Sequence, residues 1–160
     1  MAQYTIEEKQ DFAVTGVGVG LTSDYTDFVG LAKEKQAFEQ KVISDGTMDI
    51  LKQASENGFF FTVNAMRDHK MMYYAGVETN QELSIPTQTI SFPAGNYLVV
   101  SGSAESPEEL RNDLTNTAFG HVLREVEGYA YVGGPNAVVE MGVTDGKYTG
   151  EIWIPVVNKS

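Results

Sequence analysis

Along the first half of the chain, the pattern of apolar and polar residues is first typical of a β-strand, then of α-helices, and then of β-strands again. β-Type residues predict a strand over Tyr4–Gly20, where three alternating glycines indicate a bulge or a close backbone approach. Apolar residues at helical spacing predict a helix over about 26–44 and a shorter one over 47–56. Two further strands, 59–66 and 71–79, flank a polar turn. The first half therefore reads strand, two helices, and a hairpin.

The second half repeats this order with clearer boundary signals. Ser106 is placed as an N-cap, Pro107 is suited to the first helical position, and Glu109 completes a capping box. Asp145-Gly146 between two apolar runs predicts a two-residue hairpin turn. The predicted elements are a strand bent at Pro93, a helix, and two hairpin strands, over about 88–101, 106–128, 137–144 and 147–157.

These elements predict an α+β fold built from a duplicated β-α-β-β unit. The pseudo-repeats cover about 4–80 and 88–157 and together form one domain over 1–160. Helices that interrupt antiparallel hairpins are expected on one face of a single curved sheet. The opposite face is then expected to hold an open groove.

Composition and charge exclude several classes of function. The chain has 11 Lys and Arg against 22 Asp and Glu, two His and no Cys. Nucleic acid is disfavoured as a direct partner, because phosphates are neutralised by clustered Lys and Arg. The absence of Cys excludes disulfides and thiolate metal sites, and no apolar run has the length of a membrane span. We expect a cytoplasmic protein with no cofactor and no metal.

A series of short motifs resembles the GyrI-like small-molecule-binding domain, which is also the effector-binding part of AraC-type and MerR-type regulators. The motifs occur in order between Tyr4 and Val157: Tyr73-Tyr74-Ala75-Gly76-Val77-Glu78, Phe92-Pro93-Ala94-Gly95-Asn96-Tyr97, Pro107-Glu108-Glu109-Leu110, Glu127-Gly128-Tyr129 and Glu151-Ile152-Trp153-Ile154-Pro155-Val156. The resemblance implies a ligand groove on the sheet face away from the helices. It also implies that an acidic residue among aromatic rings meets flat, hydrophobic or cationic drugs.

The last strand carries the most specific candidate residues. Glu151 and Trp153 alternate with Ile152 and Ile154, so the two pairs face opposite sides of the sheet. The aliphatic pair is expected under the helices, which leaves the Glu and the Trp on the groove face. Glutamate is depleted in strands, so the presence of Glu151 needs an explanation. Glu151 is either a solvated residue or, as the resemblance favours, the carboxylate of the pocket.

The predicted hairpin turn suggests a second carboxylate in this site. If Asp145-Gly146 is a two-residue turn, Glu140 lies directly opposite Glu151. When two carboxyl groups face each other, the pKa of one of them rises. The protonated group could then act as a general acid and the ionised one as a general base. A longer loop or a bulge would separate the pair.

Other candidates depend on strand faces and on the resemblance. Tyr74 and Glu78 share one face, and Tyr97 could donate a hydrogen bond to a carbonyl or orient water. Each tyrosine has a structural alternative as a sheltered or half-buried ring. The remaining ligand-binding candidates, each with an alternative as core filler or lid, are Met66, Tyr131 and, where relatives often carry Trp, Phe28.

Three functions fit this pattern. The first is a protective binding protein that captures hydrophobic or cationic small molecules. The second is a hydrolase that opens the cyclopropane ring of DNA-alkylating compounds, as the resemblance allows, with Glu151 as base and Tyr97 or a protonated Glu as acid. The third is a protein-binding adaptor of the gyrase-inhibitor type. No preceding helix-turn-helix is seen, which disfavours a transcription factor, and either a monomer or a homodimer is compatible with the pattern.

Overall fold

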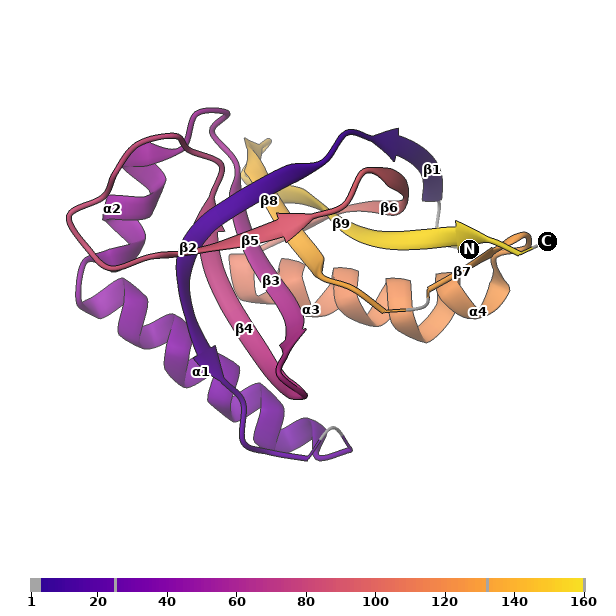
Figure 1. Cartoon of the computed structure of the whole chain (residues 1–160), viewed down its shortest axis with the longest axis horizontal. Helices are drawn as coiled ribbons and strands as arrows, with labels where there is room; N and C mark the ends of the chain where they lie inside the picture. The colour runs from indigo at the N-terminus through magenta and orange to yellow at the C-terminus, as the bar shows by residue number, and fades with distance from the viewer. Residues whose placement is uncertain (1–3, 25, 132, 160) are drawn as a thin grey trace.

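A computed structural model describes residues 4–24, 26–131 and 133–159. Its described strands form one curled antiparallel sheet in the order β1-β6-β9-β8-β3-β4-β2-β5, with the short β7 paired to β9 (Figure 1). The strands are β1 Tyr4–Lys9, β2 Phe12–Gly20, β3 Phe60–Arg67, β4 Lys70–Val77, β5 Gln88–Phe92, β6 Gly95–Ala104, β7 Tyr129–Ala130, β8 Asn136–Thr144 and β9 Lys147–Asn158.

The helices lie on one side of this sheet, as predicted. They are α1 Phe28–Ser44, α2 Thr47–Ala54 and α3 Pro107–Thr117, which continues through a π-helical turn, Ala118–Val122, into α4 Leu123–Glu125. The units β2-α1-β3-β4 and β6-α3-β8-β9 repeat the same order, with α2 added in the first. The structure therefore confirms the α+β fold with its duplicated β-α-β-β unit.

The first predicted strand is divided into two strands, β1 and β2. The break between them allows the sheet to curl. Residues 10–11 separate β1 from β2, and residues 93–94 separate β5 from β6. β1 pairs with β6 at one end of the strand order, while β2 pairs with β5 at the other. The two ends are thus brought together by chain continuity, which produces the half-barrel in Figure 1.

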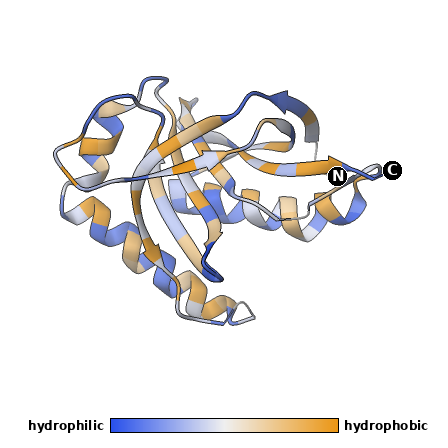
Figure 2. Ribbon diagram, in the orientation of Figure 1, coloured by the Kyte–Doolittle hydropathy of each residue, from blue (hydrophilic) through white to orange (hydrophobic). Residues whose placement is uncertain are grey.

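Local sequence explains where the long helices begin. The Ser106 hydroxyl accepts a hydrogen bond from the backbone N–H of Glu109 at 3.1 Å, which confirms the predicted N-cap of α3. Asp27 caps α1 in the same way through the N–H of Gly30 at 3.0 Å. In Figure 2 both helices carry hydrophobic and hydrophilic stripes, which is expected when one helix face packs on a sheet.

Strand alternation divides the core into an interior and an exterior layer. Ile152 and Ile154 pack under α3, whereas Trp153 points into the half-barrel beside Phe61 and Phe92. The predicted facing of the last strand is therefore confirmed. Within the interior layer, Trp153 meets Phe61 edge-on with ring centroids 5.7 Å apart.

Glycines permit the close approach of β2 and β4. Gly16 pairs with Gly76, and a side chain at Gly16 would overlap the carbonyl oxygen of Ala75. Two positions later, Gly18 leaves room for the ring of Tyr74. This is the close backbone approach that the alternating glycines predicted.

Candidate functional site

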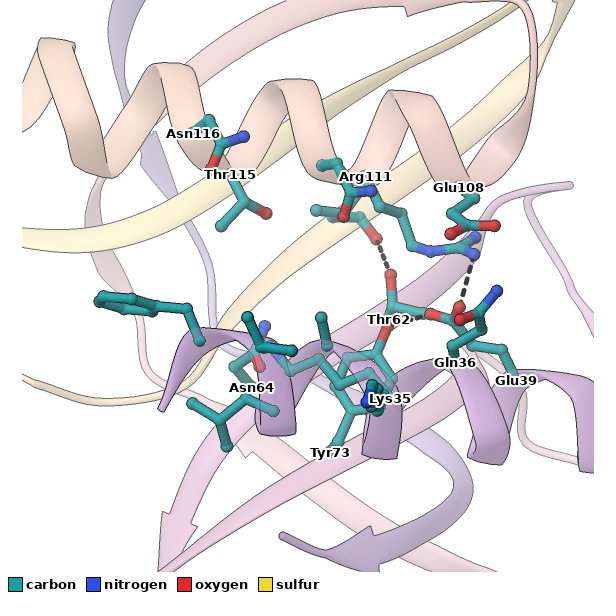
Figure 3. Close-up of a pocket in the computed structure, with 17 residues that line it drawn as sticks. Lys35, Gln36, Glu39, Thr62, Asn64, Tyr73, Glu108, Arg111, Thr115 and Asn116 are labelled. Atoms are coloured by element: carbon teal, nitrogen blue, oxygen red, sulfur yellow. Dashed lines mark hydrogen bonds and ion pairs between the residues drawn. The ribbon is translucent and has the colours of Figure 1, made fainter. Parts of the chain in front are cut away.

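A cleft between α1 and α3 encloses a cavity in the described part of the molecule. Its volume is about 520 Å³. The two helices form its walls, and β3, β4 and β8 supply a floor that includes Thr62, Asn64, Tyr73 and Val138 (Figure 3). The cleft exists because α1 packs on β2–β4 and α3 packs on β6, β8 and β9. We call it the α1–α3 cleft.

Ionic contacts join the two walls of the cleft at one end. Arg111 of α3 binds Glu39 of α1 at 3.0 Å and Glu140 of β8 at 3.2 Å. Glu39 also accepts a hydrogen bond from the hydroxyl of Tyr73. Figure 3 shows Arg111 and Glu39 pointing toward each other from the two helices. Between 13 and 14% of each of the three charged side chains is exposed, so these contacts are largely shielded from water.

Burial and charge shift the pKa values of these groups. Burial raises the pKa of Glu140, although Arg111 opposes the change. Burial and the neighbouring Glu39 carboxylate raise the pKa of the Tyr73 hydroxyl. Burial disfavours the charged form of Arg111, but Glu39, Tyr73 and Glu140 outweigh it and raise its pKa. Arg111 is therefore the cation that favours the ionised state of the Glu140 carboxylate.

A lysine holds a second positive charge in the cleft. The ammonium nitrogen of Lys35 lies 5.0 Å from the ring centroid of Tyr73. Burial lowers the pKa of Lys35, and the Glu39 carboxylate partly offsets this. The α1 wall thus places a largely buried carboxylate and a cation on a flexible side chain next to the aromatic face of Tyr73 on the floor.

The outer rim of the cleft is apolar and exposed. Phe28 and Val29, both at the start of α1, are 78% and 68% exposed, yet both line the cavity. Exposed large apolar side chains gathered at a cavity are typical of a binding site. Phe28 is the ligand-binding candidate that the structure places at this cleft.

The interior face of the sheet holds the other main candidates. Glu151 is half-buried and accepts hydrogen bonds from the Trp153 indole N–H at 2.8 Å and from the Ser101 hydroxyl at 3.3 Å. The ammonium nitrogen of Lys9 lies 4.0 Å from the Trp153 ring centroid. Glu151 and Trp153 therefore lie on the same face of the sheet and are joined by a hydrogen bond, and Lys9 covers the ring of Trp153.

The predicted pairing of Glu140 with Glu151 is wrong. The turn at Asp145-Gly146 forms as predicted, but the register shifts between Glu140 and Gly142, so Glu151 pairs with Val139. Glu140 consequently points to the helix side, where it binds Arg111, while Glu151 faces the interior. A β-bulge thus separates the two carboxylates and places them on opposite faces of the sheet.

The two tyrosine candidates lie inside the core. Tyr74 is 2% exposed and Tyr97 is fully buried. The Tyr97 hydroxyl donates to the backbone carbonyl of Pro93 at 2.6 Å, and burial raises its pKa to about 12. Tyr97 pairs with Pro155, four positions along β9 from Glu151. The two groups that the hydrolase prediction combines are therefore about 13 Å apart along the strands.

The remaining candidates lie apart from one another. Glu78 is half-buried just after β4, and its carboxylate accepts a hydrogen bond from Asn57. Met66 is 64% exposed near the end of β3. Tyr131 packs against Phe119 on the helix side and donates to the Gly134 carbonyl. The structure does not gather these three residues into one groove.

Sequence reasoning missed the residues that build the α1–α3 cleft. Lys35 and Glu39 are separated by one helical turn on α1, and Arg111 lies on the face of α3 next to Leu110 and Leu114 of the apolar stripe. Polar residues on an amphipathic helix are ordinarily solvated, so their spacing gave no signal. Only the placement of both helices on one sheet reveals their contact.

Comparisons with known proteins agree with this architecture. A family model described as "Integron-associated effector binding protein" matches residues 5–156. SAV2435, solved with bound tetraphenylphosphonium, has a TM-score of 0.77 and 16% identity, over 97% of this chain and 94% of that chain. An integron cassette protein from the mobile metagenome of Vibrio cholerae has a TM-score of 0.64 and 17% identity, over 96% and 95%. The C-terminal domain of EcmrR has a TM-score of 0.56 and 15% identity, over 99% of each chain. No curated protein matches the chain.

The curled antiparallel sheet with helices on one side defines a GyrI-like fold, as the motifs indicated. At 15–17% identity the solved structures establish this fold alone. The match over residues 5–156 goes further: the chain belongs to the family of integron-associated effector-binding proteins.

Over residues 4–24, 26–131 and 133–159, no three His, Asp or Glu side chains gather in a way that could hold a metal ion. In the same described ranges, no helix is long and apolar enough to cross a membrane.

Proposed function

We propose that this protein binds an aromatic organic cation of drug size in the α1–α3 cleft. The observation that carries the proposal is the cavity itself, which joins an apolar rim to a largely buried carboxylate, that of Glu39, beside the aromatic floor. Its volume of about 520 Å³ falls within the usual range for small-molecule sites, roughly 300–1,000 Å³. Membership of an effector-binding family supports the same class of function.

The charges in the cleft favour a cation. Arg111 and Lys35 together balance the carboxylates of Glu39 and Glu140, so the cleft presents one net negative charge only when Lys35 turns away. Lys35 already holds an ammonium group near Glu39 and over the Tyr73 ring. A bound organic cation would take this position while Lys35 turns toward solvent. The structurally similar SAV2435 was solved with tetraphenylphosphonium, which is such a cation.

The rim would supply the hydrophobic part of the affinity. Phe28 and Val29 can cover an aromatic ligand, and burying an exposed Phe side chain contributes about 1.5–3 kcal/mol when burial is complete. Burial at the rim is incomplete, so we expect the Phe28 side chain to contribute about 1 kcal/mol to the binding free energy, which is roughly a fivefold change in Kd. Capture of toxic aromatic cations would protect the cell, which is the biological role that we propose.

Isothermal titration with tetraphenylphosphonium tests the proposal. We expect Phe28→Ala to weaken binding about fivefold and Glu39→Gln to weaken it further, because the cleft loses a negative charge. Ile43→Ala is the matched control, since Ile43 is also an exposed apolar residue of α1 but does not line the cleft. Equal affinities for the wild type, Phe28→Ala and Glu39→Gln would contradict the proposed site.

A further inference from the structure

The two helical walls of the α1–α3 cleft differ in chemical character. At the outer rim the α1 wall is apolar, and its side chains there are Phe28, Val29, Leu31 and Ala32. Every α3 residue that lines the cleft is polar, and these residues are Glu108, Arg111, Asn112, Thr115 and Asn116. Figure 3 shows Thr115 and Asn116 on α3, across the cleft from α1. A ligand in the cleft would therefore meet an apolar surface on one side and hydrogen-bonding groups on the other.

Along α3, uncharged polar groups follow the ionic contacts. Arg111 binds the carboxylates of Glu39 and Glu140, whereas Thr115 and Asn116 lie about one helical turn further along the helix. From Arg111 to Thr115 the helix rises about 6 Å, which is about the length of a benzene ring with one atom attached at each end. An aromatic cation whose charge lies near Glu39 would thus bring a substituent at the far end of its ring level with Thr115.

The floor adds another uncharged polar group. Asn64 is half-buried in β3, between Tyr73 of β4 and Asn136 of β8. Asparagine is depleted in strands, and a buried amide is costly unless it forms hydrogen bonds. Within residues 4–24, 26–131 and 133–159, Thr62 donates to the Val138 carbonyl at 3.5 Å, but no hydrogen bond engages the side-chain amide of Asn64. The Asn64 amide is therefore available to a ligand in the cleft.

We propose that Asn64, Thr115 and Asn116 are specificity-determining residues, which donate hydrogen bonds to a carbonyl group on the aromatic ring of the bound cation. The inference rests on the proposed function and narrows its ligand class to aromatic cations that carry such a carbonyl. Each of the three side chains has a donor, an amide N–H or a hydroxyl O–H. The positive charge of Arg111, one turn away, favours an acceptor at this position. Tetraphenylphosphonium has no carbonyl, so it would use only the charge and the apolar rim.

Two matched cations test the proposal, para-acetylbenzyltrimethylammonium and para-isopropylbenzyltrimethylammonium. They share the same charged group and the same ring, and they differ in whether the second substituent carries a carbonyl oxygen. A hydrogen bond between uncharged groups corresponds to about a fivefold change in Kd. We therefore expect the wild type to bind the acetyl compound about fivefold more tightly than the isopropyl compound, as measured by NMR titration of the labelled protein.

Variants of the three residues should change this preference and not the binding of tetraphenylphosphonium. The triple variant Asn64→Val, Thr115→Val, Asn116→Ala should bind the two matched cations equally. Thr117→Val is the matched control and should keep the preference, because Thr117 also lies on α3 but lines a separate crevice next to β6. If the triple variant does not fold, Asn116→Ala alone repeats the test at an exposed helix position and should reduce the preference.

The outcomes separate this inference from the proposed function. Equal affinities of the wild type for the two matched cations, or an unchanged preference in the triple variant, would overturn the inference. Binding of tetraphenylphosphonium without saturable binding of either matched cation would overturn it as well. In each of these cases the proposed cation site in the cleft would stand. If tetraphenylphosphonium does not bind either, the proposed function fails together with the inference.

Discussion

Replacing Arg111 by Met should destabilise the protein in a pH-dependent way. The substitution keeps an unbranched stem of similar length but removes the cation between Glu39 and Glu140. Removing one partner of a fully buried ion pair costs about 3–5 kcal/mol. Because these side chains remain 13–14% exposed, we expect about 2–3 kcal/mol of lost unfolding free energy at pH 7.5.

The sign of the pH dependence follows from Glu140. Burial raises its pKa in the folded state, and Arg111 limits that rise. Without Arg111 the folded-state pKa should rise further above the unfolded value. For a group shifted in this direction, stability is fully present below the unfolded pKa and is lost as the pH rises through the folded pKa. The cost of Arg111→Met should therefore be small near pH 4 and largest at pH 7.5.

Urea unfolding followed by Trp153 fluorescence measures this cost at each pH. The matched control is the triple variant Arg111→Met, Glu39→Gln, Glu140→Gln, which removes the two charges that the single variant leaves unpaired. We expect the triple variant to recover most of the loss at pH 7.5, since neutral groups replace the uncompensated carboxylates. An equal loss at pH 4 and pH 7.5, or a loss below about 0.5 kcal/mol at pH 7.5, would refute the reasoning.

Three further predictions concern the fold. Ser106→Ala should lower the unfolding free energy by about 1 kcal/mol, because it removes the N-cap of α3, and thermal unfolding measures the change. Gly16→Ala should cost about 1–3 kcal/mol in urea unfolding, because its new methyl group would meet the Ala75 carbonyl oxygen. The raised pKa of Tyr97, about 12, should make the wild type lose stability as the pH rises from about 10 to about 12. Tyr97→Phe should reduce that alkaline loss and leave the part that comes from Tyr73, whose pKa is also raised. An unchanged alkaline profile would contradict this prediction.

Local signals in the sequence predicted much of the fold. The capping box at Ser106, the turn at Asp145-Gly146 and the alternation around Trp153 each involve residues that are close in sequence, and each is confirmed. The GyrI-like motifs extended these signals to the whole sheet. The break at residues 10–11 was not predicted, although the five consecutive polar residues 7–11 interrupt the apolar pattern there.

The candidate sites were harder to predict, because they depend on contacts between distant segments. One extra residue near Met141 moves Glu140 to the helix face, and nothing in the local pattern marks that bulge. Glu39 and Arg111 meet only because two helices share one sheet. Lys9 reaches Trp153 through strand neighbours that the sequence order does not reveal.

The central claim is that an aromatic cation binds between α1 and α3. Its most direct test is an NMR titration of the labelled protein with tetraphenylphosphonium, with every backbone amide followed. The account predicts saturable shifts concentrated in residues 28–39 of α1, in 108–116 of α3, and at Thr62 and Tyr73 of the floor. Saturable shifts confined to β1, β6 and β9, with the two helices unaffected, would contradict it.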